Sequence, residues 1–378
     1  MSAGLRAGYK QTEVGVIPGD WEIRRLNEVA DFLDGQRRPV KDTDRGKMRG
    51  DIPYYGASGI VDYVNDYLFD DDLILLGEDG ENILSRNCRL AFRVSGKVWV
   101  NNHAHVLKPK DGNEIGYLVE FLESLNYEQY NTGTAQPKLN KQVCSGLQVV
   151  VPPIPEQRAI AAALSDVDAL LGGLDRLIAK KRDLKQAAMQ QLLTGQTRLP
   201  GFSGEWEMKR LGDVSPLQRG FDLLTTRLRQ GGYPVVYSNG VSSYHNEFMV
   251  KGPGVITGRS GTIGNVHFVE EDFWPHNTSL WVTSFKGNSP KFIFYLLGSL
   301  GLEKFGTGSG VPTLNRNDVH AHKVRIPPTP DEQTAIATIL SDMDTELTAL
   351  EARRDKTRAL KQGMMQELLT GRIRLLAN

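Results

Sequence analysis

The sequence predicts an α+β fold, with two mixed, strand-rich domains separated by two long helices that form an antiparallel coiled coil with pseudo-two-fold symmetry. Three observations predict this fold. Segment 164–195 recurs 176 residues later as 340–371, with the same Leu-Ser-Asp start and Leu-Leu-Thr-Gly end. In both copies the apolar residues lie alternately four and three positions apart, which is the spacing of a coiled coil. Short β-branched runs punctuated by glycine recur in the rest of the chain.

The chain length of 378 residues allows two to three domains with cores of their own. Apolar runs of membrane-spanning length and a signal peptide are both absent, so we expect a soluble, cytoplasmic protein with no membrane partner. The only two cysteines, Cys88 and Cys144, argue against a disulfide framework and a cysteine-based zinc site. We expect both to be reduced, semi-buried thiols.

The repeat divides the chain into a first domain (1–151), a central helix (152–201), a second domain (202–326) and a C-terminal helix (327–378). The openings match as well, since Gly-Asp-Trp-Glu at 19–22 returns as Gly-Glu-Trp-Glu at 204–207. Alternating and β-branched runs predict strands at 61–64, 73–76, 98–107, 147–151, 235–237, 254–257, 265–269, 279–283 and 322–326. One helix-like stretch interrupts each domain, at 115–125 and 291–300.

Both long helices have start and stop signals. Pro155 and Pro330 suit first-turn positions, acidic residues follow them, and Gly195 and Gly371 stand where a helix ends. The predicted seam consists of Ile160, Leu164, Val167, Leu171, Leu174, Ile178, Ile336, Leu340, Met343, Leu347 and Leu350. Two equal stripes in one chain can cover each other. The alternative is that each stripe packs on a partner protein or on a second copy of this chain.

The charge balance is neutral, with 45 basic and 45 acidic residues. Affinity for nucleic acid needs only a local basic cluster, because only the phosphates that are neutralised release counterions. One such cluster holds Arg37, Arg38, Lys41, Arg45, Lys47 and Arg49, and a second holds Arg219, Arg227 and Arg229. The alternative interpretation is a pair of solvated loops whose charges only aid solubility.

Several motifs are informative together. They are the Gly-Asp-Trp-Glu opening, the turn at 258–264, the Pro-x-Leu-Asn segments at 137–140 and 312–315, the Pro-Pro-x-Pro-Glu-Gln helix start and the Leu-Leu-Thr-Gly helix end. In this combination the chain resembles the specificity subunit of type I restriction-modification systems. The resemblance covers essentially the whole chain. Two departures stand out: Arg354 replaces Ile178 in the second seam, and Glu78 stands where the second domain has Arg259.

The resemblance implies a DNA-binding protein without catalysis of its own. Two target recognition domains would each read one half of a split double-stranded DNA site in the major groove. The helices would set the spacing and dock two methyltransferase (M) subunits, which restriction and translocase (R) subunits join. Methyl donor and ATP would belong to those partners, so this chain would need no cofactor.

Enzymatic alternatives lack the residues they need. His103 and His105 form an H-x-H pair that could ligate a metal on one strand face, but no third ligand is visible. The glycine spacing at 258–264 fits neither the dinucleotide fingerprint nor the phosphate loop. Methyl transfer is improbable as well, because no Asn-Pro-Pro-Tyr or Asp-Pro-Pro-Tyr stretch occurs.

Base and phosphate contacts favour Arg, Lys, Asn, Gln and Ser side chains in polar loops. The candidate DNA-binding residues are Gln36, Arg37, Arg38, Lys41, Ser58 and Lys138 in the first domain, and Arg219, Arg227, Asn239, Arg259, Ser260, Ser309 and Arg316 in the second. Two alternatives stay open. One is a coiled-coil scaffold whose two variable domains bind proteins or sugars, and the other is a methylation-only system without a nuclease.

Overall fold

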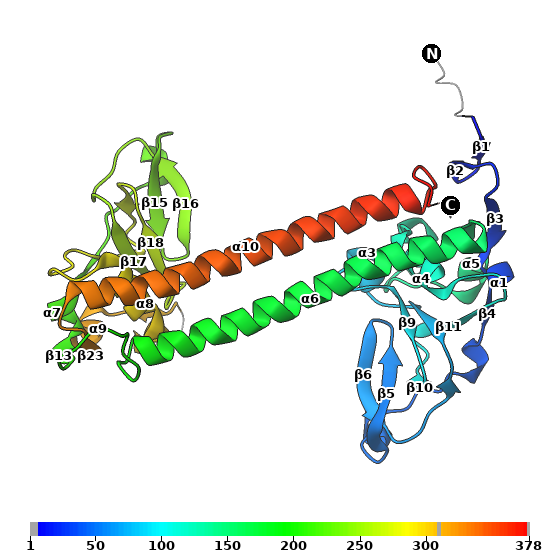
Figure 1. The fold of residues 1–378 in the computed structure, drawn as a ribbon, viewed down its shortest axis with the longest axis horizontal. Coiled ribbons are helices and arrows are strands. Elements are labelled where there is room, and N and C mark those ends of the chain that lie inside the picture. Colours follow the sequence, from blue (N-terminus) through cyan, green and yellow to red (C-terminus); the bar gives the residue numbers. More distant parts are fainter. Residues whose placement is uncertain (1–6, 308–310, 376–378) are drawn as a thin grey trace. The chain divides into compact units, whose positions relative to one another are not determined.

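The computed structural model describes residues 7–307 and 311–375, which form two compact units. The first unit comprises Met1–Leu174 and Arg353–Asn378, and the second comprises Asp175–Ala352 (Figure 1). The expected fold class is confirmed, because each unit is a mixed, strand-rich domain that carries part of both long helices. Candidate residue Ser309 lies outside the described residues.

Two four-stranded sheets dominate the first unit, with strand orders β4-β11-β8-β9 and β6-β5-β10-β7. The pairs β1-β2 and β12-β3 stand apart from them. The strands are β1 (Tyr9–Thr12), β2 (Gly15–Pro18), β3 (Glu22–Arg25), β4 (Ala30–Phe32), β5 (Arg49–Gly56), β6 (Gly59–Val64), β7 (Phe69–Asp70), β8 (Leu73–Gly77), β9 (Ala91–Val94), β10 (Lys97–Val100), β11 (Ala104–Pro109) and β12 (Gln148–Val151). The short helices are α1 (Leu26–Val29), η1 (Asp34–Gln36), α2 (Asp42–Arg45), α3 (Asn82–Ser85), α4 (Ile115–Ser124), η2 (Glu128–Tyr130) and α5 (Lys141–Ser145).

The second unit repeats this arrangement with sheets β14-β20-β17-β18 and β16-β15-β19, and with the pairs β13-β23 and β21-β22. Its strands are β13 (Glu207–Arg210), β14 (Leu217–Arg219), β15 (Tyr233–Tyr237), β16 (Gly240–His245), β17 (Gly254–Gly258), β18 (Val266–Val269), β19 (Trp274–Pro275), β20 (Ser279–Val282), β21 (Gly306–Thr307), β22 (Thr313–Leu314) and β23 (Lys323–Ile326). Its short helices are α7 (Leu211–Val214), η3 (Thr225–Arg227), α8 (Pro290–Ser299), η4 (Leu302–Phe305) and α9 (Arg316–Ala321).

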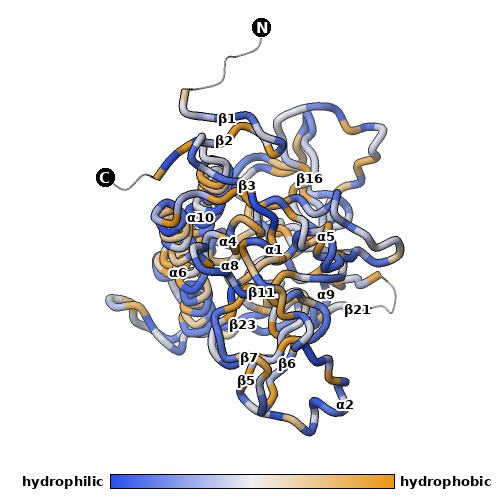
Figure 2. The backbone as a smooth tube through the Cα atoms, turned by 90° about the vertical axis from the view of Figure 1, so that its right-hand side faces the viewer, coloured by the Kyte–Doolittle hydropathy of each residue, from blue (hydrophilic) through white to orange (hydrophobic). Residues whose placement is uncertain are grey.

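The two long helices, α6 (Ile154–Leu192) and α10 (Pro330–Leu368), have 39 residues each. Both carry hydrophilic and hydrophobic residues (Figure 2). Within the second unit they run antiparallel, since Arg182 of α6 bonds Glu351 of α10 and Lys185 bonds Asp344, and in the first unit Asp168 of α6 bonds Lys361 of α10. Of the seam positions, Ile160, Leu164, Leu174, Ile178, Ile336, Leu340 and Leu347 are buried, and Val167, Leu171, Met343 and Leu350 are half-buried.

The seam also enters the domain cores. Ile160 and Leu164 share one hydrophobic cluster with Leu118 of α4 and Leu368 at the end of α10. The matching cluster of the second unit contains Ile336 and Leu340 with Phe292 of α8 and Leu192 of α6. The first turns of each long helix therefore fix that helix to its own domain, and the end of the other long helix completes the same core.

In the first turn of each long helix, a buried glutamate accepts hydrogen bonds from a tryptophan and an arginine. Glu156 accepts from Trp21 Nε1 at 3.0 Å and from Arg374 Nε and Nη2 at 2.7 Å each. Glu332 accepts in the same way from Trp206 and Arg198. Because a buried carboxylate must be paired and hydrogen-bonded, the repeated Trp-Glu and Pro-Glu-Gln motifs have a structural reason.

The helices end as the glycines predict. Gly195 and Gly371 adopt φ angles of 73° and 70°, which side chains other than glycine rarely adopt. A Cβ atom at Gly195 would lie 3.1 Å from the Trp206 ring, and one at Gly371 would lie 2.4 Å from Pro18. Glycine thus ends each helix and lets the following chain pass against the opening motif of a domain.

Two expectations need correction. The run 98–107 is two strands, β10 and β11, because the chain turns at residues 101–103 between them. The cysteines are also unlike each other, since Cys144 is buried whereas Cys88 is exposed. Within residues 7–307 and 311–375, no helix has the length and apolar character needed to span a membrane.

Candidate functional site

Three loops of the first unit meet at the end of β8. Glu78 N donates to His103 O at 2.8 Å, Leu139 N donates to Glu78 O at 2.7 Å, and Gly80 N donates to Pro137 O at 3.0 Å. We call this arrangement the loop frame. It joins the turn at 77–80, the turn between β10 and β11, and the Pro-x-Leu-Asn segment. Asn140 then caps α5 by accepting from Val143 N at 2.9 Å.

The second unit contains the same loop frame. Arg259 N donates to Thr278 O at 2.8 Å, Leu314 N donates to Arg259 O at 2.7 Å, and Gly261 N donates to Pro312 O at 3.1 Å. These donors and acceptors stand at the equivalent repeat positions, so the backbone of the frame is shared while the side chains on it differ.

A hairpin turn lies against each loop frame. A Cβ atom at Gly77 would come within 2.8 Å of Ala57 O, and one at Gly258 within 3.0 Å of Ser238 O. Glycine is required at both places because the backbones approach so closely. The candidate residues Ser58 and Asn239, each next along the chain, are therefore held beside the frames.

Charges on the two frames are reversed. In the first unit Asp34 lies beside Arg37, with 3.6 Å between Oδ2 and Nη2, and Arg37 Nη1 donates to Glu78 Oε2 at 2.7 Å. The residue equivalent to Asp34 in the second unit is Arg219, whose Nη2 donates to Asp222 Oδ1 at 2.7 Å. Arg259 replaces Glu78 and donates to Asn277 O at 3.3 Å. The first frame thus has the carboxylates of Asp34 and Glu78 where the second has the guanidinium groups of Arg219 and Arg259.

The candidate residues of the first unit differ in availability. Gln36, Arg38, Lys41, Ser58 and Lys138 are exposed. Arg37 is half-buried, and its guanidinium is occupied by Glu78, by Ala104 O at 2.7 Å and by Asp34 O at 3.1 Å. Lys138 Nζ lies 3.3 Å from Glu78 Oε1, so Lys138 belongs to the same charge cluster.

In the second unit Arg219, Arg227, Asn239 and Arg316 are exposed, and Arg259 and Ser260 are half-buried. Ser260 N donates to Thr278 O at 3.1 Å, which fixes this turn against the frame. Arg227 ends η3, and Arg316 begins α9 directly after its capping residue Asn315. The loop frame thus gathers Arg259, Ser260 and Asn239, while Arg227 and Arg316 lie on neighbouring elements.

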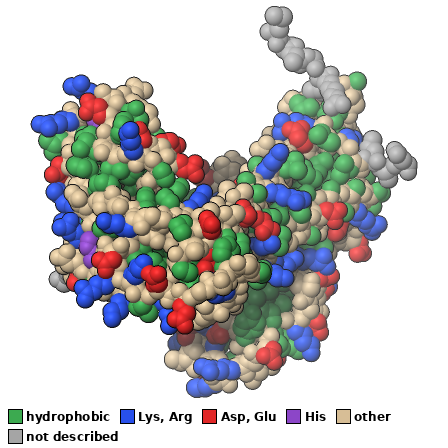
Figure 3. Space-filling model, turned by 60° about the vertical axis from the view of Figure 1, so that its left-hand side comes forward, with side chains coloured by type: hydrophobic (Ala, Val, Ile, Leu, Met, Phe, Trp, Pro, Cys, Tyr) green, Lys and Arg blue, Asp and Glu red, His purple; other side chains and the backbone are tan. Residues whose placement is uncertain are grey.

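The basic stretch after β4 is partly neutralised. Arg45 bonds Asp62 at 2.9 Å and also Asp42, and Lys47 lies 3.5 Å from Asp44. Figure 3 shows basic and acidic side chains interspersed on the visible surface. Contacts with phosphates would therefore depend on a few individual side chains.

The two histidines of the H-x-H pair do not converge. His103 is half exposed and its Nδ1 lies 2.8 Å from Asp79 Oδ2, whereas His105 is buried beside Asp34. No group of three or more His, Cys, Asp or Glu side chains suited to a metal ion occurs in the described part of the chain. Sequence reasoning missed Asp34 and Asp222, although lining up the repeats sets Asp34 opposite Arg219 and Arg37 opposite Asp222.

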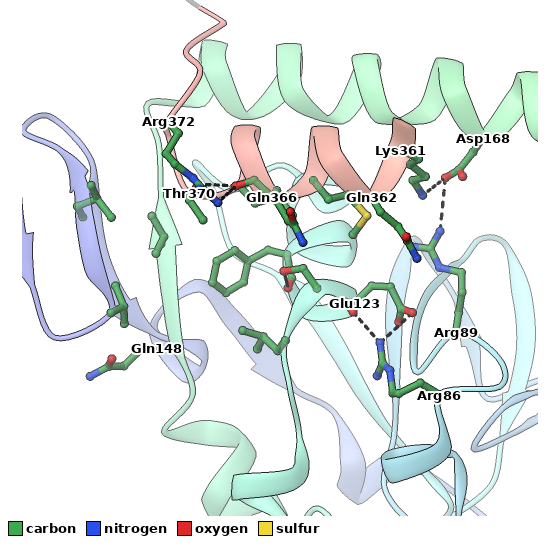
Figure 4. A pocket seen from close by; sticks show the side chains of 18 of the residues that line it. Arg86, Arg89, Glu123, Gln148, Asp168, Lys361, Gln362, Gln366, Thr370 and Arg372 are labelled. Carbon is green, nitrogen blue, oxygen red and sulfur yellow. Dashed lines mark hydrogen bonds and ion pairs between the residues drawn. The ribbon is translucent and has the colours of Figure 1, made fainter. Parts of the chain in front are cut away.

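A groove of about 1440 Å³ lies beside the end of α10 in the first unit (Figure 4). The end of α4, β12 and the β1-β2 hairpin form the other walls. On one wall Lys361 Nζ donates to Asp168 Oδ2 at 2.7 Å, and Arg86 Nη2 donates to Glu123 O at 2.6 Å. Cys88 lies on the lining too.

The second unit has a groove of about 700 Å³ made from equivalent positions. Gln362, Met365, Gln366, Leu369 and Thr370 line the first groove, and Gln186, Met189, Gln190, Leu193 and Thr194, each 176 positions earlier, line the second. The ends of α4 and α8 and the strands β12 and β23 correspond as well. The chain therefore presents one Gln-Met-Gln-Leu-Thr surface in each unit.

Comparisons with known proteins agree with this duplication. The sequence model of the type I restriction modification DNA specificity domain matches twice, at residues 18–179 and 203–358. A putative type I restriction enzyme specificity subunit of Haemophilus influenzae is 26% identical over 86% of this chain and 88% of its own length. The putative MjaX specificity subunit of Methanocaldococcus jannaschii is 22% identical and covers 97% of each chain.

Solved structures share the fold. The S subunit of the type I restriction-modification system from M. genitalium superposes with a TM-score of 0.67 at 16% identity, over 92% of this chain and 96% of that one. A chain from a study of complex assembly in the type I R-M system gives a TM-score of 0.55 at 15% identity, over 94% and 99% of the two chains.

Proposed function

Because this chain belongs to the family of type I restriction modification DNA specificity domains, we propose that it is the non-catalytic DNA-recognition subunit of a type I restriction-modification complex. Each domain reads one half of a bipartite double-stranded site. The observation that carries the proposal is the duplicated loop frame, which has one backbone and two different sets of side chains.

The frames offer different chemistry to a DNA groove. Arginine bonds guanine through O6 and N7, whereas carboxylates accept from the cytosine amino group. Arg259 stands on the second frame where Glu78 stands on the first. Two unlike half-sites are the natural targets of such a pair. The exposed residues Arg38, Lys41, Arg227 and Arg316 are suited to phosphates, which position the protein without reading sequence.

We assign the docking of two methyltransferase subunits to the two equivalent grooves. An identical surface presented twice is suited to two copies of one partner, since each copy meets the same Gln, Met, Leu and Thr side chains. The long helices would set the DNA spacer, and R subunits would join the assembled core. Methyl transfer, ATP use and cleavage would then belong to the partners, in the cytoplasm.

The direct test is methylation sequencing of the source cell with and without this gene. The expected result is a methyladenine motif of two short halves separated by a fixed gap, which disappears on deletion. A motif that survives deletion, or one without a gap, contradicts the proposal. A scaffold that binds proteins or sugars through its two domains would leave the methylation pattern unchanged.

A further inference from the structure

His105 lies at the centre of the first loop frame. It belongs to β11, where it pairs with Leu76 of β8, and its side chain is 1% exposed. Its Nδ1 lies 2.8 Å from Asp34 Oδ2, and its Nε2 lies 2.8 Å from Leu139 O. Glu78 Oε2 is 3.8 Å from Nδ1. Phe32 packs edge-on against the ring, and Cys144 of α5 is a further titratable neighbour.

Both ring nitrogens face acceptors. A backbone carbonyl can only accept, so Nε2 carries a proton, and an ionised carboxylate can only accept, so Nδ1 carries one too. The ring is therefore an imidazolium. Burial opposes this charge, but the interactions with Asp34 and with the neighbouring Cys144 outweigh burial and raise the pKa of His105 to about 10.

The imidazolium holds together the loops that carry the candidate DNA contacts. Asp34 opens the segment with Gln36, Arg37 and Arg38, and its Oδ1 also accepts from Val106 N at 3.0 Å. Leu139 follows Lys138 directly. The positive ring stands beside two carboxylates, Asp34 and Glu78, and joins Arg37 and Lys138 in offsetting their charge, which would otherwise repel DNA phosphates.

We propose that His105 is a positioning residue for the first half-site: its imidazolium ties the 34–38 segment to the Pro-x-Leu-Asn loop and balances the carboxylates of the frame. This inference rests on the proposed function, since it concerns how one of the two domains presents its reading loops.

The second unit lacks this device. Leu280 pairs with Thr257 of β17 as His105 pairs with Leu76 of β8, so Leu280 is the equivalent residue. The residue equivalent to Asp34 in the second unit is Arg219. A defect at His105 should therefore affect one half-site only, which separates positioning from a general loss of folding.

The experiment uses the full chain assembled with its methyltransferase partner. Duplexes carry the bipartite motif identified by methylation sequencing, either intact or with one half scrambled. For His105→Gln we expect the preference for an intact first half to fall by about tenfold or more, because a mismatched base pair typically costs 1–3 kcal/mol. The preference for an intact second half should not change.

Two further variants make the test specific. Gln142→Ala changes an exposed side chain of α5 outside the loop frame and should leave both preferences unchanged. Asp34→Asn combined with His105→Gln removes the carboxylate that has lost its imidazolium partner and should recover part of the first-half preference. An equal loss on both halves, or no loss on either, overturns the inference. Failure of the unaltered complex to prefer any bipartite duplex would instead count against the proposed function.

Imidazole ¹⁵N shifts test the charge of the His105 ring directly. Its signal should remain that of a doubly protonated ring at pH 8, where an ordinary histidine with a pKa of about 6.5 is neutral. That signal should be missing from His105→Gln. A neutral His105 at pH 8 overturns the charge-balancing role.

Discussion

Lys361 of α10 lies 2.7 Å from Asp168 of α6, and the repeat reproduces this pair between Lys185 and Asp344. Lys361 also lies 2.9 Å from Glu120 of α4, whereas the equivalent third partner in the second unit is Tyr295, which donates to Asp344 at 2.8 Å. Each pair joins both long helices to the helix of one domain, so it favours one register of the helices over others.

Replacing Lys361 with alanine should destabilise the first unit by about 2 kcal/mol, because Glu120 and Asp168 lose a largely buried cation. Hydrogen exchange of α4 and of the end of α10 measures the loss. Lys181→Ala is the matched control, since its pair with Glu346 is more exposed and should contribute about 0.5 kcal/mol or less. Equal losses in the two variants would contradict a structural role of the buried pair.

Arg374→Ala should free the tail after α10 and weaken the packing around Trp21, because Glu156 keeps one indole donor and loses its cation. Arg198→Ala should likewise free the segment after α6 and weaken the packing around Trp206 in the second unit. Limited proteolysis of the segments that follow the two long helices measures the effects of both substitutions. Cleavage rates that match those of the unaltered chain would show that the arginine is dispensable.

Acid should loosen the same contact. The hydrogen bond from Arg374 is the main cause that lowers the pKa of Asp20 below its ordinary value of 3.8. The contribution of Asp20 is therefore complete above pH 3.8 and disappears as the pH falls through its lower folded value. Tail protection measured from pH 5 to pH 2 should show a step in the unaltered chain that is absent from Asp20→Asn.

Replacing Arg259 with alanine should weaken or relax recognition of one half-site only, by about 1 to 3 kcal/mol if the side chain reads a base. Competition binding with duplexes altered in either half measures this. Arg316→Ala serves as a comparison for a phosphate contact, for which affinity should fall alike on every sequence and the salt dependence should decrease. Loss on all sequences for Arg259→Ala would make it a phosphate contact instead.

Gln366→Arg and Gln190→Arg should each remove one methyltransferase copy from the assembly, and the double variant should remove both. Both side chains are exposed, and each lines one of the two grooves. Native mass spectrometry reports the copy number. Gln142→Arg, on the exposed face of α5 and away from both grooves, is the control.

The exposed Cys88 gives an independent test of the same surface. It lies on the lining of the first groove, so the partner should protect it from a thiol reagent, whereas Cys144 reacts only after unfolding. Unchanged labelling of Cys88 in the assembled complex would show that the methyltransferase subunit does not dock on the first groove.

The long helices were the most predictable part of the fold, because proline, glycine and the apolar spacing are local signals and the repeat presents them twice. The break at residues 101–103 was missed because the β-branched and aromatic residues on either side suggest one strand, although Asn101 and Asn102 are turn-forming residues. The role of Arg37 was equally hidden. A basic residue in a polar stretch suggests a free contact, but Glu78 and Ala104 O, distant in sequence, engage it. The partners of His105 at positions 34 and 139 likewise come together only in the tertiary structure.

The first unit consists of two pieces of sequence, whereas the second is continuous. During synthesis the second unit therefore has all of its residues once position 352 has left the ribosome, while the first must wait for Arg353–Asn378. The domain made first is the last to be completed. A nonsense codon before position 368 would consequently damage the amino-terminal domain, because Leu368, Leu369 and Arg374 would never reach its core and its helix start.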